Sequence, residues 1–165
     1  MPFIPELNDG LNIPQVYCRS MTGEIHFTDD IFFKPQDKGL FRMFVYLKHS
    51  TELQSVRDTL RNVEDWSEGE LVGDKIPVIF EEMQPGKGAI EDRNVYQLAT
   101  GEELAWSPLC DRRPEPIGYD EYLLRDNIKG KFVIMRPDRY TFAACNGKDE
   151  LEKAVGFMMH VLRGK

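Results

Sequence analysis

His49, Ser50 and Thr51 are the residues of this chain whose types and position best suit catalysis. They follow an almost continuously apolar run, Leu40 to Lys48, and they precede a segment with helical spacing. Backbone N–H groups at a helix start can stabilise a developing negative charge, and histidine titrates near neutral pH. These three residues are therefore the catalytic candidates. A histidine that only flanks a helix start accounts for the same pattern, because one polar residue makes no catalytic constellation.

The cysteines and histidines are too dispersed to predict redox or metal chemistry. No Cys-x-x-Cys pair occurs, and no cysteine lies where the apolar run meets its helix. The three histidines show no ligand spacing for zinc or iron, so we expect no metal. Cys18 and Cys145 fit packed interior positions, whereas Cys110 precedes charged residues and is expected to be exposed. An odd number of distant cysteines favours a reducing compartment, and we expect a cytoplasmic protein.

Cofactor and nucleic-acid binding also lack sequence support. Gly86-Lys87-Gly88 has no phosphate-loop spacing and no Gly-x-Gly-x-x-Gly occurs, so we expect no FAD, NAD or ATP. With 28 acidic against 21 basic residues, the net charge of −7 does not favour nucleic acid or an anionic membrane. No apolar run approaches the roughly 20 residues that span a bilayer. The acidic pairs Asp29-Asp30 and Glu81-Glu82 are interpreted as solvated strand ends.

Hydrophobic spacing predicts the elements that position these residues. After an arm at residues 1–12, residues 15–20 and 24–27 predict a hairpin, and residues 40–48 predict a central strand covered on both faces. Thr51 and Gln54 have the form of a capping box for the next helix. The inward stripe of that helix is Leu53, Val56, Leu60 and Val63. Residues 76–80 predict another strand, with Pro77 at its start or on an edge.

The last third of the chain predicts a helix, a hairpin and a closing helix. The first helix covers residues 117–128, and the strands Lys131–Arg136 and Tyr140–Cys145 flank a Pro-Asp turn. The closing helix has its apolar face at Leu151, Ala154, Val155, Met158, Val161 and Leu162. The resulting order βαβαββα is that of thioredoxin, an α/β fold with a central mixed sheet. We expect one domain over residues 1–165, with an irregular insertion at 81–116 in which residues 94–107 fit a hairpin or a frayed helix.

The end of the chain resembles a known family. Arg136-Pro137-Asp138-Arg139-Tyr140, preceded by Gly130, Tyr119, Tyr122 and Asp126, is similar to the C-terminal domain of the phenol hydroxylase class of FAD-dependent aromatic monooxygenases. The resemblance covers about two thirds of the chain and weakens toward its start. It implies a thioredoxin-like domain associated with dimerisation, whose flavin and substrate domains have no counterpart in this sequence. Arg136, Pro137, Asp138 and Tyr140 are accordingly assigned to fold or interface.

Two interpretations follow. The chain is either a free-standing dimerising or partner-binding module, with a second copy or a flavin monooxygenase as its partner, or a small cofactor-independent enzyme. The enzyme would be an isomerase, cyclase or hydrolase that acts on an aromatic or polyketide-like metabolite, with Trp66 and Trp106 walling its ligand pocket. The absence of a convergent acid, base and nucleophile favours the module. We expect Met1 and Lys165 to be natural ends, the alternative being a piece of a larger flavoenzyme.

Overall fold

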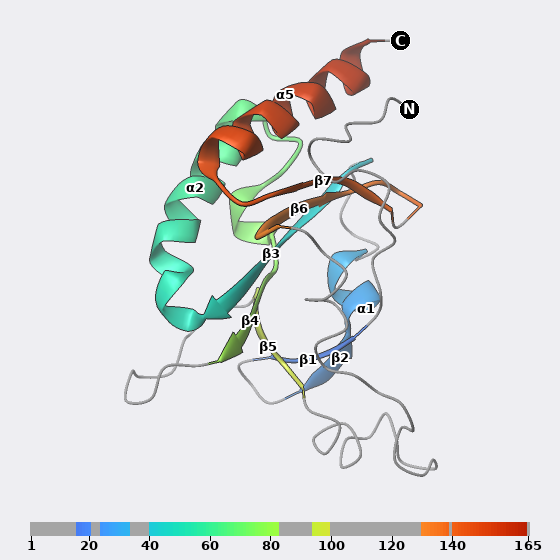
Figure 1. The fold of residues 1–165 in the computed structure, drawn as a ribbon. Helices are drawn as coiled ribbons and strands as arrows, with labels where there is room; N and C mark the ends of the chain where they lie inside the picture. The colour runs from blue at the N-terminus through green and yellow to red at the C-terminus, as the bar shows by residue number, and fades with distance from the viewer. Residues whose placement is uncertain are drawn as a thin grey trace.

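A seven-stranded mixed sheet lies at the centre of the computed structural model, in the order β2-β1-β5-β4-β3-β6-β7 (Figure 1). The structure describes residues 16–20, 24–33, 40–82, 94–99, 130–138 and 140–164, with the side chains of residues 29, 50 and 82 excepted. The predicted arm at 1–12, the predicted helix at 117–128 and most of the insertion lie outside the described residues.

The strands and helices have the following bounds. The strands are β1 (Tyr17–Ser20), β2 (Ile25–Phe27), β3 (Arg42–His49), β4 (Val78–Glu82), β5 (Val95–Leu98), β6 (Phe132–Met135) and β7 (Thr141–Cys145). The α-helices are α1 (Thr28–Phe32), α2 (Leu53–Trp66) and α5 (Lys148–Arg163), and the 3₁₀ helices are η2 (Ser50–Glu52) and η3 (Gly73–Lys75).

Four of the strands have the arrangement of the thioredoxin fold. They lie in the order β7-β6-β3-β4, where β3 and β4 are parallel and β6 is antiparallel to both β3 and β7. The helix α2 connects β3 to β4, and α5 follows β7. The thioredoxin-like α/β fold predicted from hydrophobic spacing is therefore confirmed.

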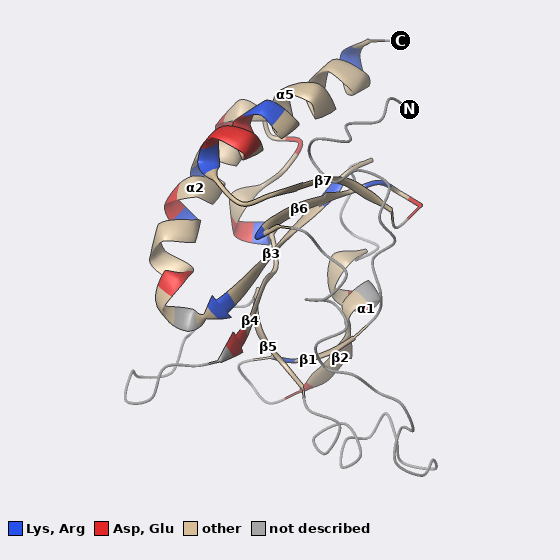
Figure 2. Ribbon diagram, viewed as in Figure 1, with Lys and Arg blue, Asp and Glu red and all other residues tan. Residues whose placement is uncertain are grey.

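The sheet separates two hydrophobic cores. The side chains of β3 alternate between them, so that Val45 packs with α2 and α5 on one face, whereas Phe44 packs with α1 on the other. Figure 1 shows α2 and α5 side by side on one side of the sheet, with α1 on the opposite side. Figure 2 shows that α2 and α5 carry many charged residues, whereas the strands are largely uncharged. The central strand is thus buried on both faces, as its continuous apolar sequence predicts.

The structure adds one element that the sequence analysis missed and decides between two alternatives at another. Residues 28–32 form the short helix α1, so Asp29 and Asp30 lie in a helix and the prediction that they end a strand was wrong. Residues 95–98 form β5, which pairs in parallel with β4 and antiparallel with β1. Through β5 the N-terminal hairpin becomes part of the main sheet. A strand at 95–98 agrees with the hairpin interpretation of this stretch and not with the helical one.

The predicted capping box does not form. The α-helix begins at Leu53, after the 3₁₀ turn η2, and no side chain caps its first turn. The inward stripe is nevertheless correct, since Val56, Leu60 and Val63 are buried. Packing of this stripe against the sheet therefore fixes the helix without the capping hydrogen bonds.

Candidate functional site at the two ends of the central strand

The carboxyl ends of β3 and β4 bring the predicted catalytic residues to one edge of the sheet. The two strands are parallel, and His49 lies opposite Glu82 in the register. The turn η2 continues from this edge into α2 and contains Ser50 and Thr51. His49 and Thr51 are exposed, and the Ser50 side chain is not described. The structure thus places the three candidates where ligands collect in open α/β sheets.

An ion pair lies at the start of α2. Lys131 Nζ is 2.7 Å from Glu52 Oε1, and about two thirds of each side chain is covered, with exposed fractions of 33% and 36%. The hydrogen bond from Lys131 is the main cause that lowers the pKa of Glu52. Burial opposes this shift, and the charge of Lys131, a hydrogen bond from the His49 backbone and the charge of His49 add to it.

This ion pair defines the charge at the start of α2. An ionised Glu52 next to the first N–H groups of α2 supplies the negative charge that a helix start favours. The Lys131 ammonium compensates that charge. The catalytic role of His49, Ser50 and Thr51 stays a prediction.

A series of side-chain hydrogen bonds links neighbouring strands near the carboxyl ends of β3 and β4. The Tyr46 hydroxyl donates to Glu81 Oε1 at 2.7 Å, and the Gln97 side chain donates to the Glu81 carbonyl at 3.4 Å. The Arg19 guanidinium in turn donates to Gln97 Oε1. These bonds link β3, β4, β5 and β1. The interpretation of Glu81 as a solvated strand end was therefore wrong, because its carboxylate is partly buried and accepts a hydrogen bond.

The described cysteines do not supply a nucleophile. Cys18 and Cys145 are both buried, as expected from their sequence context. Burial raises the pKa of the Cys18 thiol far above its ordinary value. Burial, and next the charge of Glu150, raise the pKa of the Cys145 thiol to about 12. Since the thiolate is the reactive form, these two thiols are inert near neutral pH.

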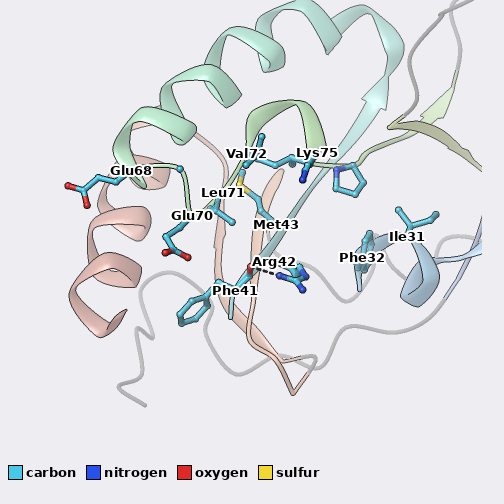
Figure 3. Close-up of a pocket in the computed structure, with 13 residues that line it drawn as sticks. Ile31, Phe32, Phe41, Arg42, Met43, Glu68, Glu70, Leu71, Val72 and Lys75 are labelled. Carbon is cyan, nitrogen blue, oxygen red and sulfur yellow. Dashed lines mark hydrogen bonds between the residues drawn. The ribbon is translucent and has the colours of Figure 1, made fainter. Parts of the chain in front are cut away.

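A cavity of about 350 Å³ lies at the opposite, amino end of β3 (Figure 3). Its apolar walls come from α1, the start of β3 and the segment between α2 and β4. The lining residues are Ile31, Phe32, Phe41, Arg42, Met43, Glu68, Gly69, Glu70, Leu71, Val72, Lys75, Ile76 and Pro77. Arg42 and His49 are seven residues apart on β3, which corresponds to roughly 23 Å along a strand. The cavity and the predicted catalytic residues are therefore separate sites.

Trp66 is not among the described residues that line this cavity. Trp66 ends α2, is partly buried against the helix-side core, and has the Lys148 ammonium 6.0 Å from its ring centroid. Trp106 and Cys110 lie outside the described residues. A pocket walled by the two tryptophans stays a prediction. The cavity that is seen carried no sequence signal, because its described residues come from three separate segments and only the fold brings them together.

The Arg136-Pro137-Asp138 turn joins β6 to β7 and is internally hydrogen-bonded. Arg136 lies 2.5 Å from Asp138, whose second carboxylate oxygen accepts the Tyr140 N–H at 3.1 Å. The Arg136 N–H donates to the Tyr140 carbonyl at 2.9 Å, and the Arg136 guanidinium lies 5.9 Å from the centre of the Tyr140 ring. These contacts fix the turn and leave the Tyr140 side chain on the surface, where the residue is 42% exposed.

The described parts of the chain contain no group of three or more His, Cys, Asp or Glu residues that could hold a metal ion. No helix among them is long and apolar enough to cross a membrane.

Comparison with known proteins adds little to this description. No family model and no curated protein matches the chain. Two solved structures of yeast Sco1, one of them with copper bound, align with a TM-score of 0.46 each. The copper-bound structure is 12% identical and the alignment covers 94% of both chains, and the other is 14% identical with 94% of this chain and 99% of the Sco1 chain covered. Likeness at this level carries no argument about function, and the fold assignment depends on the strand order itself.

Proposed function

We propose that this chain is a partner-binding module on a thioredoxin-like scaffold, that it works without dithiol chemistry, and that it forms a homodimer. The resemblance to the C-terminal domain of phenol hydroxylase-type monooxygenases supports association as its role. A flavin monooxygenase is the alternative partner. The exposed aromatic side chain of Tyr140, held on a hydrogen-bonded turn, is the observation that carries the proposal.

The surroundings of Tyr140 suit an association surface. Leu40 is 63% exposed and precedes β3 by two residues, and the register places Arg42 opposite Met135 at the end of β6. Leu40 and Tyr140 therefore lie at the same end of β3, β6 and β7. Rigid aromatic residues contribute most at interfaces because little side-chain entropy is lost when they bind. The Arg136–Asp138 ion pair and the hydrogen bond from the Tyr140 N–H to Asp138 fix the turn, which further reduces the entropy lost on binding.

The chemistry of the opposite edge supports a role without thiol exchange. A dithiol enzyme of this fold needs a low-pKa cysteine where the first central strand meets its helix. Here that junction has the sequence Lys48-His49-Ser50-Thr51-Glu52, and Glu52 is paired with Lys131. The buried thiols of Cys18 and Cys145 suit a reducing environment, and we place the module in the cytoplasm.

Sedimentation velocity at micromolar concentration tests the proposal. We expect a dimer for the wild type and a monomer for the double variant Leu40→Ser/Tyr140→Ser. Phe157→Ser is the matched control, because Phe157 is also a large exposed apolar residue (38%) but lies on α5. This variant should remain dimeric. A monomeric wild type that also fails to bind flavin monooxygenases of its source would contradict the module.

A cofactor-independent enzyme acting on an aromatic or polyketide-like metabolite is the second candidate. The cavity of about 350 Å³ favours a small-molecule site in general. The predicted catalytic residue His49 lies at the other end of β3, so the cavity gives this hypothesis no base. Separate His49→Ala and Trp106→Ala variants, assayed on the transformation that neighbouring genes suggest, test the enzyme. Full activity in both variants would place the site elsewhere.

A further inference from the structure

We propose that the cavity at the amino end of β3 binds a small apolar carboxylate. The carboxylate would lie at Lys75 and Arg42, and the apolar body would lie between Phe32 and Phe41. This site is separate from the carboxyl end of β3, which carries His49, and it lies at the same end of β3 as Leu40 of the association surface.

The aromatic walls of the cavity are fixed before any ligand enters. Phe32 stacks on Phe44 with 4.3 Å between ring centroids and 12° between ring planes. Phe41 packs edge-on against Phe142 at 5.0 Å and 62°. All four rings belong to buried residues. Each wall is thus supported by a second ring, Phe32 in the core on the α1 side of the sheet and Phe41 in the core on the α2 side.

The size and lining of the cavity suit a ligand of about ten non-hydrogen atoms. A cavity of roughly 150 Å³ already holds benzene, and ligand sites start at about 300 Å³. The cavity here measures about 350 Å³. Ile31, Met43 and Ile76 complete its apolar lining. An aryl or branched alkyl group therefore matches the walls, and one polar head group can reach the rim.

The charges at the rim select a negative head group. Figure 3 shows Lys75 and Arg42 on the side of the cavity that holds Phe32, and Glu68 and Glu70 on the other side. Lys75 is exposed, and its ammonium has no hydrogen bond or ion pair with any residue that the structure describes. The Arg42 guanidinium donates to the Phe41 carbonyl at 3.4 Å, which holds it in the cavity wall.

The acidic residues of the rim do not offer an equivalent site for a cation. Glu68 is bonded to Arg163 at the end of α5, so its charge is already compensated. Glu70 alone would receive an ammonium group. A carboxylate instead meets the Lys75 ammonium, and the Arg42 guanidinium, which has contacts of its own, lies on the same side of the cavity.

Three probes with the same apolar body test this selection: 3-phenylpropanoate, 3-phenylpropan-1-ol and 3-phenylpropylamine. Each is titrated into the full chain while the methyl signals of Ile31, Ile76 and Met43 are followed by NMR. We expect saturable shifts with the carboxylate, binding of the alcohol weaker by about fivefold or more, and no binding of the amine. Absence of shifts up to about 10 mM carboxylate, or equal affinity for the alcohol, would overturn the proposal.

Two lysine variants give the second test. Lys75→Met should weaken binding of 3-phenylpropanoate by about fivefold and leave the affinity for the alcohol unchanged. Lys48→Met is the matched control, because it removes the same charge from an exposed position at the far end of β3. It should bind the carboxylate as the wild type does. If Lys75→Met and Lys48→Met have the same affinity, the head group does not lie at Lys75 and the proposal fails.

Discussion

Lys131 and Glu52 are 79 positions apart in sequence, and their charged groups meet at 2.7 Å. The pair joins the segment before β6 to the residue that precedes α2. It lies at the junction of β3 and α2, and its strength can be measured.

The ion pair should contribute modestly to stability, with a defined pH dependence. Because the pKa of Glu52 is lowered in the folded state, the contribution is present above the ordinary carboxyl pKa of about 4.3 and is lost as the pH falls through the lower folded value. Glu52→Gln should cost about 0.5 kcal/mol at pH 7, a small value because both side chains are about one-third exposed and screened by solvent. Urea unfolding at pH 7 and at about pH 3 measures the difference.

A double-mutant cycle separates the pair from other effects of the substitution. Glu52→Gln and Lys131→Met together should show a coupling energy of about 0.5 kcal/mol at pH 7. Glu152→Gln, on the exposed face of α5, is the control and should change little. A coupling energy that does not decrease between pH 7 and about pH 3 would contradict the assignment.

Gly130 is expected to tolerate no side chain. A Cβ atom there would lie 2.5 Å from the Cys145 backbone nitrogen and 2.7 Å from the Ala144 carbonyl carbon. Since both neighbours are backbone atoms of β7, Gly130→Ala should destabilise the fold by about 2 kcal/mol or more. Gly156→Ala is the matched control, because its Cβ would meet nothing within 4 Å in the middle of α5. It should stabilise by about 0.5–1 kcal/mol. Thermal unfolding measures the stability of both variants. If Gly130→Ala is as stable as the wild type, the backbone of β7 does not lie as close to Gly130 as stated.

The hydroxyl of Tyr46 should stabilise the sheet through Glu81. Tyr46→Phe removes the donor of the 2.7 Å hydrogen bond and leaves the partly buried carboxylate with one partner fewer, so we expect a loss of about 1–2 kcal/mol. Tyr96→Phe removes a hydroxyl that has no hydrogen bond to the described part of the chain. Its effect on the free energy of unfolding should be close to zero. Equal effects in both variants would show that the bond contributes nothing.

The two buried thiols should resist modification in the native state. With Cys110 replaced by serine, Cys18 and Cys145 remain, and burial raises the pKa of both thiols. We expect no reaction with Ellman's reagent at about pH 8 in buffer and reaction of both thiols in urea. The protein should also fail to reduce insulin disulfides. Rapid stoichiometric labelling of the folded variant would contradict this expectation and reopen thiol chemistry.

The fold was predictable where one segment carries its own pattern. The apolar run of β3 indicates a strand buried on both faces, and the stripe at Val56, Leu60 and Val63 indicates a helix packed on one face. Neither signal needs information from elsewhere in the chain. The hairpin β6–β7 is equally local, because its Pro-Asp turn is short.

The missed helix α1, and the choice between hairpin and helix at residues 94–107, depend on distant partners. The strand β5 has four residues and is held by β4 and β1, which its own sequence does not reveal. The helix α1 has five residues, too few for a helical period to stand out, and Phe32 is held by its stack on Phe44. The cavity has the same origin, since Phe32 and Lys75 meet only after the sheet has formed.

The burial of β7 limits the ways in which this molecule can be recognised. It is the last strand of the described sheet on its side, yet all five of its residues are buried, whereas β2 on the other side is only three residues long. An open edge of some length is what a partner needs in order to add a strand of its own. Neither edge of the described sheet offers one. Addition of a partner's strand is therefore disfavoured at both of these edges, which also protects the described sheet from uncontrolled growth.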